Sequence, residues 1–101
     1  MDINKKKDGT KLIYELDGEL DLVSSPILQK DIDESIDGVT ELVFDFKNVK
    51  YISSTGIRVL LASQKIMNKQ GTLKVLNVND TIMDLFKVTG FDSILNIENN
   101  P

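Results

Sequence analysis

The chain is short and acidic: its 101 residues are 41% hydrophobic and carry a formal net charge of -4. This length allows one compact domain with a single core, and the negative charge disfavours direct binding to nucleic acid, which selects basic surfaces. Cys and His are both absent, which removes thiolate and imidazole metal sites and every nucleophile that depends on a histidine base. We therefore expect a protein that is not an enzyme and holds no metal or cofactor.

Targeting signals are missing from the start of the chain. Residues 1–4 are followed by three lysines and lack the apolar stretch of a signal peptide. No later apolar run is long enough to cross a bilayer. We expect a cytoplasmic protein that does not associate with a membrane.

The first predicted feature along the chain is an N-terminal β-hairpin. Residues 11–16 have the pattern of a strand, and Asp8-Gly9 shortly before them is a strong signal for a tight turn. This turn would pair the strand with a short strand over residues 3–7. The two strands are expected to run antiparallel.

A helix is predicted next, over residues 26–37. Ser25 suits the N-cap, Pro26 suits the first helical position, and Gly38 is a natural stop after the last turn. The apolar segment that follows, residues 41–46, is short and rich in β-branched and aromatic side chains. It predicts a central strand that is covered on both faces.

A second helix is predicted to begin within residues 53–56, whose sequence Ser-Ser-Thr-Gly is rich in capping residues. Apolar side chains at helical spacing continue it, and Gly71 marks its end with a residue that suits a left-handed cap. Residues 72–78 then alternate in the manner of a strand.

The remaining residues predict a short helix and a last strand. Asp80 is expected to cap the helix, Gly90 to end it, and residues 93–97 to form the strand, with 98–101 as a frayed tail. The order of elements predicts an α/β domain over residues 1–97. It would have a single mixed, mostly parallel β-sheet and about three helices.

The most informative feature for function is the group of three hydroxyls in residues 53–56. They stand at a strand-to-helix turn, where backbone N–H groups and the helix dipole favour an anion. A phosphate on one of them would be tolerated by the fold and would change the surface offered to a partner. Arg58 lies one helical turn beyond Ser54 and could pair with that phosphate or with a partner's carboxylate. In the alternative interpretation, these residues only open a helix and Arg58 is a solvated side chain.

Four blocks distributed along the chain carry a resemblance to a known family. They are Gly18-Glu19-Leu20-Asp21-Leu22 with Ser25-Pro26, Leu42-Val43-Phe44-Asp45-Phe46, Tyr51-Ile52-Ser53-Ser54-Thr55-Gly56 with Ile57 and Leu60-Leu61, and Phe86-Lys87-Val88-Thr89-Gly90-Phe91. In this order they resemble the STAS family, and specifically its small stand-alone bacterial members, the anti-sigma factor antagonists. The resemblance implies a STAS-like fold over nearly the whole chain.

The resemblance also implies a partner-switching cycle that regulates transcription by a sigma factor. The unphosphorylated antagonist would bind an anti-sigma factor with serine kinase activity, phosphorylation would break the complex, and a serine phosphatase would restore it. The family's phospho-acceptor is the serine before a Ser/Thr-Gly pair, which falls on Ser54, followed here by Thr55 and Gly56. Family members commonly carry Asp before the acceptor. This chain has Ser53 there, which makes Ser53 a rival acceptor.

A partner-binding surface follows from the resemblance as well. It is formed by the loop after the second strand and by the start of the helix that bears the serine. In this chain its residues are Asp21, Ser24, Ser25, Ser53, Thr55, Gly56 and Arg58. Asp21 could instead be a capping carboxylate. Asp45, which ends a strand, could support the Ser54 loop by hydrogen bonding.

Two other functions remain open at this point. The chain could be a STAS adaptor module in another signalling or transport complex, because fold alone does not specify function. It could also be a small receiver-like phospho-acceptor with Asp45 as the acceptor. Such chemistry needs an acidic cluster at the end of the first strand and a supporting lysine, and Tyr14-Glu15-Leu16-Asp17-Gly18 is a poor substitute. The sequence is compatible with a monomer or with a weak dimer formed through an exposed edge strand.

Overall fold

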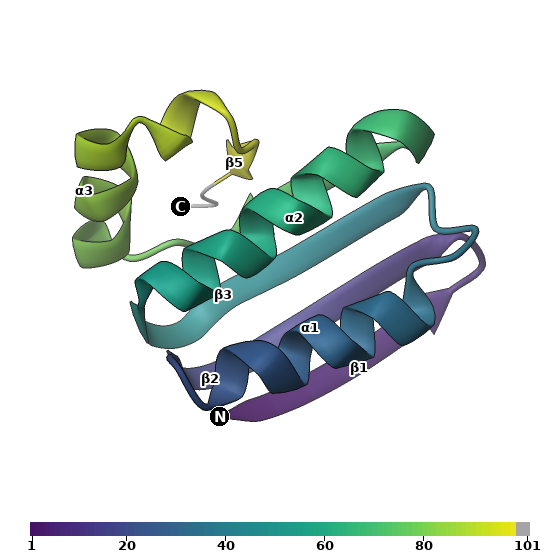
Figure 1. Ribbon diagram of the computed structural model, residues 1–101, viewed down its shortest axis with the longest axis horizontal. Coiled ribbons are helices and arrows are strands. Elements are labelled where there is room, and N and C mark those ends of the chain that lie inside the picture. Colours follow the sequence, from purple (N-terminus) through teal and green to yellow (C-terminus); the bar gives the residue numbers. More distant parts are fainter. Residues whose placement is uncertain (99–101) are drawn as a thin grey trace.

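The structure is a computed structural model that describes residues 1–98. It is an α/β domain in which the helices lie against a sheet (Figure 1). In chain order the elements are β1 (Asp2–Asp8), β2 (Lys11–Leu20), α1 (Ser24–Ser35), β3 (Glu41–Ile52), α2 (Ser54–Gln70), β4 (Thr72–Leu76), α3 (Asp80–Thr89), a 3-10 turn (Phe91–Ser93) and β5 (Ile97–Glu98).

The sheet follows the order of the chain, β1-β2-β3-β4-β5. Strands β1 and β2 are antiparallel and join through the turn at Gly9, whose positive φ of 61° suits glycine. Each later strand pairs parallel to the one before it. The predicted N-terminal hairpin and the mixed, mostly parallel sheet are both confirmed.

The long helices α1 and α2 lie side by side over one face of the sheet (Figure 1). On β3, the side chains of Leu42, Phe44 and Phe46 join the hydrophobic core beneath the helices. Val43 and Asp45 alternate with them and line a shallow hollow on the opposite face, together with charged residues of neighbouring strands. The prediction of a strand covered on both faces is wrong. The reason lies in the order of the strands. Each β-α-β crossover leads to the next strand in the same direction across the sheet, and crossovers of the same hand then place all their helices on the same face.

The core is apolar and contains a stacked aromatic pair. The rings of Tyr14 on β2 and Phe44 on β3 lie with their centroids 5.7 Å apart, an arrangement that favours aromatic contact. Phe86 of α3 is fully buried in the same core. These contacts join β2, β3 and α3 in one core.

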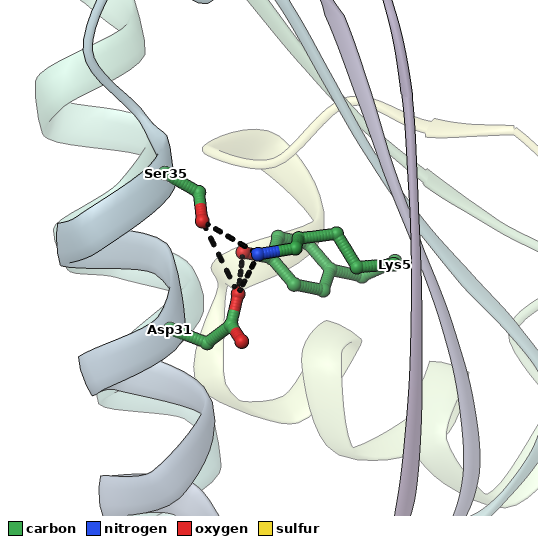
Figure 2. Close-up of polar contacts among 4 residues, drawn as sticks. Lys5, Asp31 and Ser35 are labelled. Atoms are coloured by element: carbon green, nitrogen blue, oxygen red, sulfur yellow. Dashed lines mark hydrogen bonds and ion pairs between the residues drawn. The ribbon is translucent and has the colours of Figure 1, made fainter.

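A polar cluster ties α1 to the N-terminal hairpin (Figure 2). The Asp31 carboxylate lies 3.2 Å from the Lys5 ammonium and accepts hydrogen bonds from the hydroxyls of Tyr14, at 2.7 Å, and Ser35, at 3.3 Å. The Lys5 ammonium also donates to the Ser35 hydroxyl, at 3.0 Å. These four residues are called the Asp31 cluster below. Each of the four side chains thus has at least one polar partner within the cluster.

The environment of the Asp31 cluster shifts the pKa of two of its groups in opposite directions. Burial, followed by the hydrogen bond to Asp31, raises the pKa of Tyr14 well above its ordinary value. Burial would raise the pKa of Asp31 as well. The hydrogen bonds from Tyr14 and Lys5 and the charge of Lys5 outweigh burial, so the pKa of Asp31 is lowered. The cluster thus holds a neutral phenol against an ionised carboxylate.

Two predicted helix starts need correction. Helix α1 begins at Ser24 and is not capped by Ser25, because the cap is supplied from outside the helix by Asp21. At α3 the side chain of Asn79 accepts a hydrogen bond from the N–H of Ile82 at 2.8 Å, so Asn79 is the N-cap and Asp80 is the first helical residue. Asp80 then lies in the first turn of α3, where the helix dipole favours a carboxylate.

Helix ends and the C-terminal segment also differ in part from the predictions. Helix α1 ends at Ser35 before Gly38 is reached, whereas α3 ends as expected at Gly90, which has a positive φ of 80°. A strand over 93–97 is wrong, because the 3-10 turn occupies Phe91–Ser93 and β5 has two residues, Ile97–Glu98. Residue 98 therefore pairs in the sheet, while 99–101 of the predicted tail lie outside the described residues. The division into a domain and a tail stays a prediction.

Candidate functional site

The predicted site residues come together at one end of the molecule, where β2 and β3 end and α1 and α2 begin (Figure 1). The N–H of Ser53 donates to the carbonyl of Leu20 at 2.9 Å, which joins the ends of the two strands. The hydroxyl of Thr55 donates to that of Ser25 at 3.3 Å, which joins the starts of the two helices. Residues 21–27 and 53–58 are called the helix-start region below.

Ser53 and Thr55 use their hydroxyls inside the protein. Ser53 is the N-cap of α2, and its Oγ accepts from the N–H of Gly56 at 3.4 Å. The same oxygen lies 2.6 Å from the hydroxyl oxygen of Thr55. Both side chains are half-buried. The prediction that residues 53–56 open the second helix is confirmed, and two of the three hydroxyls serve that purpose.

Ser54 differs from both neighbours. It is the first residue of α2 and is exposed. Within residues 1–98, its hydroxyl takes part in none of the side-chain hydrogen bonds. Of these three neighbouring side chains, Ser54 is therefore the exposed one that makes no side-chain hydrogen bond within residues 1–98.

The loop before α1 is organised by Asp21. Its carboxylate accepts from the N–H groups of Val23, at 3.0 Å, and Ser24, at 2.9 Å, and its carbonyl accepts from the N–H of Ser25. The hydrogen bond from the N–H of Ser24 is the main reason why the pKa of Asp21 is lowered. Asp21 thus acts as a turn and capping carboxylate, and its predicted contact with a partner stays a prediction.

Ser24 and Ser25 support this loop from inside the protein. The Ser24 hydroxyl donates to the carbonyl of Glu19 at 2.8 Å and accepts from the N–H of Asp21 at 2.9 Å. Both serines are buried. Their positions fix the backbone of the helix-start region, and their predicted direct contact with a partner stays a prediction.

Gly56 allows α2 to start close to the strand ends. A Cβ at this position would lie 2.7 Å from Cγ1 of Ile52 and 2.9 Å from the carbonyl oxygen of Leu20. Either distance is shorter than packed atoms tolerate. Because Gly56 is buried, its contribution to the site is to allow the close approach that positions Ser54.

Arg58 is exposed and lies on α2 between two hollows. The first, about 440 Å³ in volume, lies between α2 and α3 and has a mainly apolar lining that includes Leu61, Leu85 and Phe91 as well as Ser54. The second, about 290 Å³, lies between the starts of α1 and α2. The structure therefore places Arg58 near Ser54, as the sequence predicts, and at the rim of both hollows.

Sequence reasoning missed three exposed apolar residues beside the site. Leu22, Val23 and Ile27 are 72%, 73% and 59% exposed. The sequence did contain a signal for them. Leu28 and Ile32 define the predicted buried face of the helix, and Val23 and Ile27, which are one turn apart, lie outside that face. Exposed large apolar side chains grouped beside a candidate site are typical of a protein interface.

Asp45 does not support the Ser54 loop, contrary to prediction. Its carboxylate accepts from the N–H of Lys47 at 3.0 Å and from the side-chain amide of Asn77 at 3.1 Å. The reason is that β3 continues to Ile52, so Asp45 lies in the middle of the strand. Within the described part of the chain, no three acidic or metal-binding side chains lie close enough together to hold a metal ion.

Comparison with known proteins agrees with this arrangement. The family model described as STAS domain matches residues 2–101. The chain belongs to the STAS family. The sequence-based assignment to that family is therefore confirmed. No helix within residues 1–98 has the length and apolar character needed to span a membrane.

Two curated relatives and one solved protein are similar over most of their length. The anti-sigma-B factor antagonist of Bacillus subtilis is 29% identical over 98 residues, covering 96% of this chain and 90% of the relative. The anti-sigma F factor antagonist of Paenibacillus polymyxa is 33% identical over 92 residues, covering 88% and 79%. The anti-sigma factor antagonist SpoIIAA in its unphosphorylated form is 17% identical, with a TM-score of 0.80 and coverage of 99% and 89%. That structural likeness confirms the fold.

Proposed function

We propose that this STAS protein is an anti-sigma factor antagonist that acts by partner switching. In the unphosphorylated state it binds an anti-sigma factor that is also a serine kinase, and so releases a sigma factor. Phosphorylation of Ser54 breaks the complex, and a serine phosphatase restores it. The names of the curated relatives support the role as antagonist.

The exposed hydroxyl of Ser54 is the observation that supports this site. A kinase needs an acceptor hydroxyl that it can reach, and Ser53 and Thr55 are both half-buried and hydrogen-bonded to each other. Phosphorylation of Ser53 would also use up the hydroxyl that contacts Thr55 at 2.6 Å and accepts from the N–H of Gly56. A phosphate on Ser54 would instead lie at a helix N-terminus, where the dipole stabilises negative charge.

Electrostatic and steric exclusion is the mechanism of release. The exposed apolar residues Leu22, Val23 and Ile27 and the exposed start of α2 form a surface suited to a close protein contact. A phosphate on Ser54 would add about -1.5 to -2 charge at the centre of that contact. Burying that much negative charge in a protein contact is strongly unfavourable, so the complex dissociates.

Phosphorylation of purified protein tests the acceptor. Incubation with ATP, Mg²⁺ and the anti-sigma factor of its host is expected to add one phosphate, located on Ser54 by mass spectrometry. Ser54→Ala should abolish the modification, whereas the matched variant Ser53→Ala should retain it. Phosphate on Ser53 alone would overturn the site assignment.

Binding measurements test the mechanism of release. Ser54→Asp is expected to weaken the complex with the anti-sigma factor at least tenfold, which corresponds to about 1.4 kcal/mol, while Ser54→Ala binds normally. Normal binding by Ser54→Asp would contradict exclusion. Capture of partners from the host provides a further check, since recovery of a membrane transporter without an anti-sigma factor would favour the adaptor alternative.

A further inference from the structure

Arg58 is an isolated cation in an apolar setting. Among the residues that line the hollow between α2 and α3, and likewise the hollow between α1 and α2, it is the only charged side chain. The ion pairs found within residues 1–98 all involve lysines and leave Arg58 without an acidic partner there. On a protein of net charge -4, this guanidinium is available to an anion from outside.

Arg58 also lies within reach of Ser54. The two residues are four positions apart in the regular helix α2, which places them on the same face with Cβ atoms about 5–6 Å apart. Both line the hollow between α2 and α3. A phosphate on Ser54 would therefore enter the space in front of the guanidinium.

We propose that Arg58 is the specificity-determining cation of this site: it pairs with a carboxylate of the partner, and the Ser54 phosphate captures it when the protein is phosphorylated. This inference rests on the proposed function and adds to it the chemistry of the partner. The partner presents an acidic side chain to Arg58 beside an apolar side chain that enters the hollow between α2 and α3. The charge of Arg58 and the apolar lining of that hollow together define this occupant.

Competition between two anions makes the switch more than a steric block. A guanidinium binds a carboxylate or a phosphate through paired hydrogen bonds, but it carries a single positive charge, which a neighbouring phosphate dianion neutralises. In the unphosphorylated protein the partner's carboxylate takes Arg58. After phosphorylation the Ser54 phosphate is the permanent neighbour and the stronger charge, and the partner's carboxylate is left without its counter-ion while facing a dianion.

The capture step can be tested without the partner. The full chain with phosphoserine incorporated at position 54 is titrated by ³¹P NMR, and the second pKa of the phosphate is compared with that in Arg58→Ala. The pKa is expected to be lower in the parent protein by about 0.5 unit, since an exposed ion pair contributes only a modest energy. Lys65→Ala, which removes one exposed charge from the same helix two turns further on, is the matched control and should leave the pKa unchanged. Equal pKa values in the parent and Arg58→Ala would overturn capture by phosphate.

Partner recognition is tested by charge reversal. Arg58→Glu is expected to weaken binding of the unphosphorylated protein to the anti-sigma factor at least tenfold, Arg58→Lys to retain most of the affinity, and the control Lys65→Glu to change it less than threefold. An Arg58→Glu variant that folds and binds normally would overturn the recognition of a partner carboxylate. If Ser54 is phosphorylated and the parent binds, yet the NMR and binding comparisons both show no effect of Arg58, this inference fails while the proposed function stands.

Discussion

Two regions of this protein differ in whether their serine hydroxyls are hydrogen-bonded. In the Asp31 cluster, the hydroxyl of Ser35 both accepts from Lys5 and donates to Asp31. In the helix-start region, Ser54 has an exposed hydroxyl with no such bond among the described residues, although its neighbours Ser53 and Thr55 are bonded. In these two regions the hydroxyls that hold the fold are paired, and Ser54, which is not, is the candidate for chemistry.

The two regions also differ in what positions them. The Asp31 cluster is held by charge and hydrogen bonds between β1, β2 and α1. The helix-start region combines close packing of Gly56 on Leu20 and Ile52 with hydrogen bonds such as that of the Thr55 hydroxyl to Ser25. Because Ser54 takes part in none of the side-chain hydrogen bonds within residues 1–98, a charge could be added there without breaking them. The predictions below test this difference.

The largest expected effect is that of Gly56→Ala. The added methyl group would lie 2.7 Å from Ile52 and 2.8 Å from Leu20, and relieving such overpacking costs about 2 kcal/mol of the free energy of unfolding. Chemical denaturation measures this loss. Ser54→Ala, two residues earlier on the exposed face, is the control. Equal stability of the two variants would contradict packing as the basis of the helix-start region.

A smaller effect is expected for Tyr14→Phe, which removes the phenol from the Asp31 cluster. The lost hydrogen bond to a carboxylate is expected to reduce the free energy of unfolding by about 1 kcal/mol near pH 7. Tyr51→Phe alters an exposed tyrosine and should leave stability unchanged. A loss of similar size in both variants would show that the cluster does not stabilise the fold.

The dependence of the free energy of unfolding on pH gives a sharper test of Tyr14. The folded protein raises the pKa of Tyr14, so the unfolded chain releases its proton first, near the ordinary tyrosine pKa of about 10. The contribution of Tyr14 to the free energy of unfolding should be constant below that pH and fall as the pH rises above it. Tyr14→Phe should weaken this alkaline fall, measured by denaturation between pH 8 and about 11. An unchanged fall would mean that other groups cause it.

The smallest effects separate adjacent hydroxyls. Ser53→Ala removes the N-cap of α2 and is expected to reduce the free energy of unfolding by about 1 kcal/mol. Ser54→Ala should stay within about 0.5 kcal/mol of the parent, as for other exposed positions. Thermal or chemical denaturation of both variants in parallel measures the difference. If Ser54→Ala lost more of its free energy of unfolding than Ser53→Ala, the distinction between a structural hydroxyl at Ser53 and a free one at Ser54 would be wrong.

Local signals in the sequence were sufficient for much of the fold. Asp8 and Gly9 predicted the hairpin turn, and the capping residues at 53–56 predicted the start of α2, because turns and caps depend on side chains near in sequence. The cap at Asp21 was less clear, since Ser25-Pro26 offered a strong competing signal. The predicted role of Asp45 was wrong because Asp45 does not end its strand. The length of β3 depends on its pairing with β2, and the sequence of residues 41–46 does not reveal that pairing.

For the candidate site, the sequence singled out candidate residues without showing which contacts each of them makes. It marked Ser53, Ser54 and Thr55 as equivalent hydroxyls at a helix start, and resemblance to the STAS family favoured the middle one. Only the tertiary structure distinguished the three hydroxyls by their contacts. The Thr55 hydroxyl, for example, bonds to Ser25, 30 positions away, and this bond forms only when the two helix starts pack together. The same packing left Ser54 and Arg58 exposed beside an apolar hollow, a juxtaposition that exists only in three dimensions.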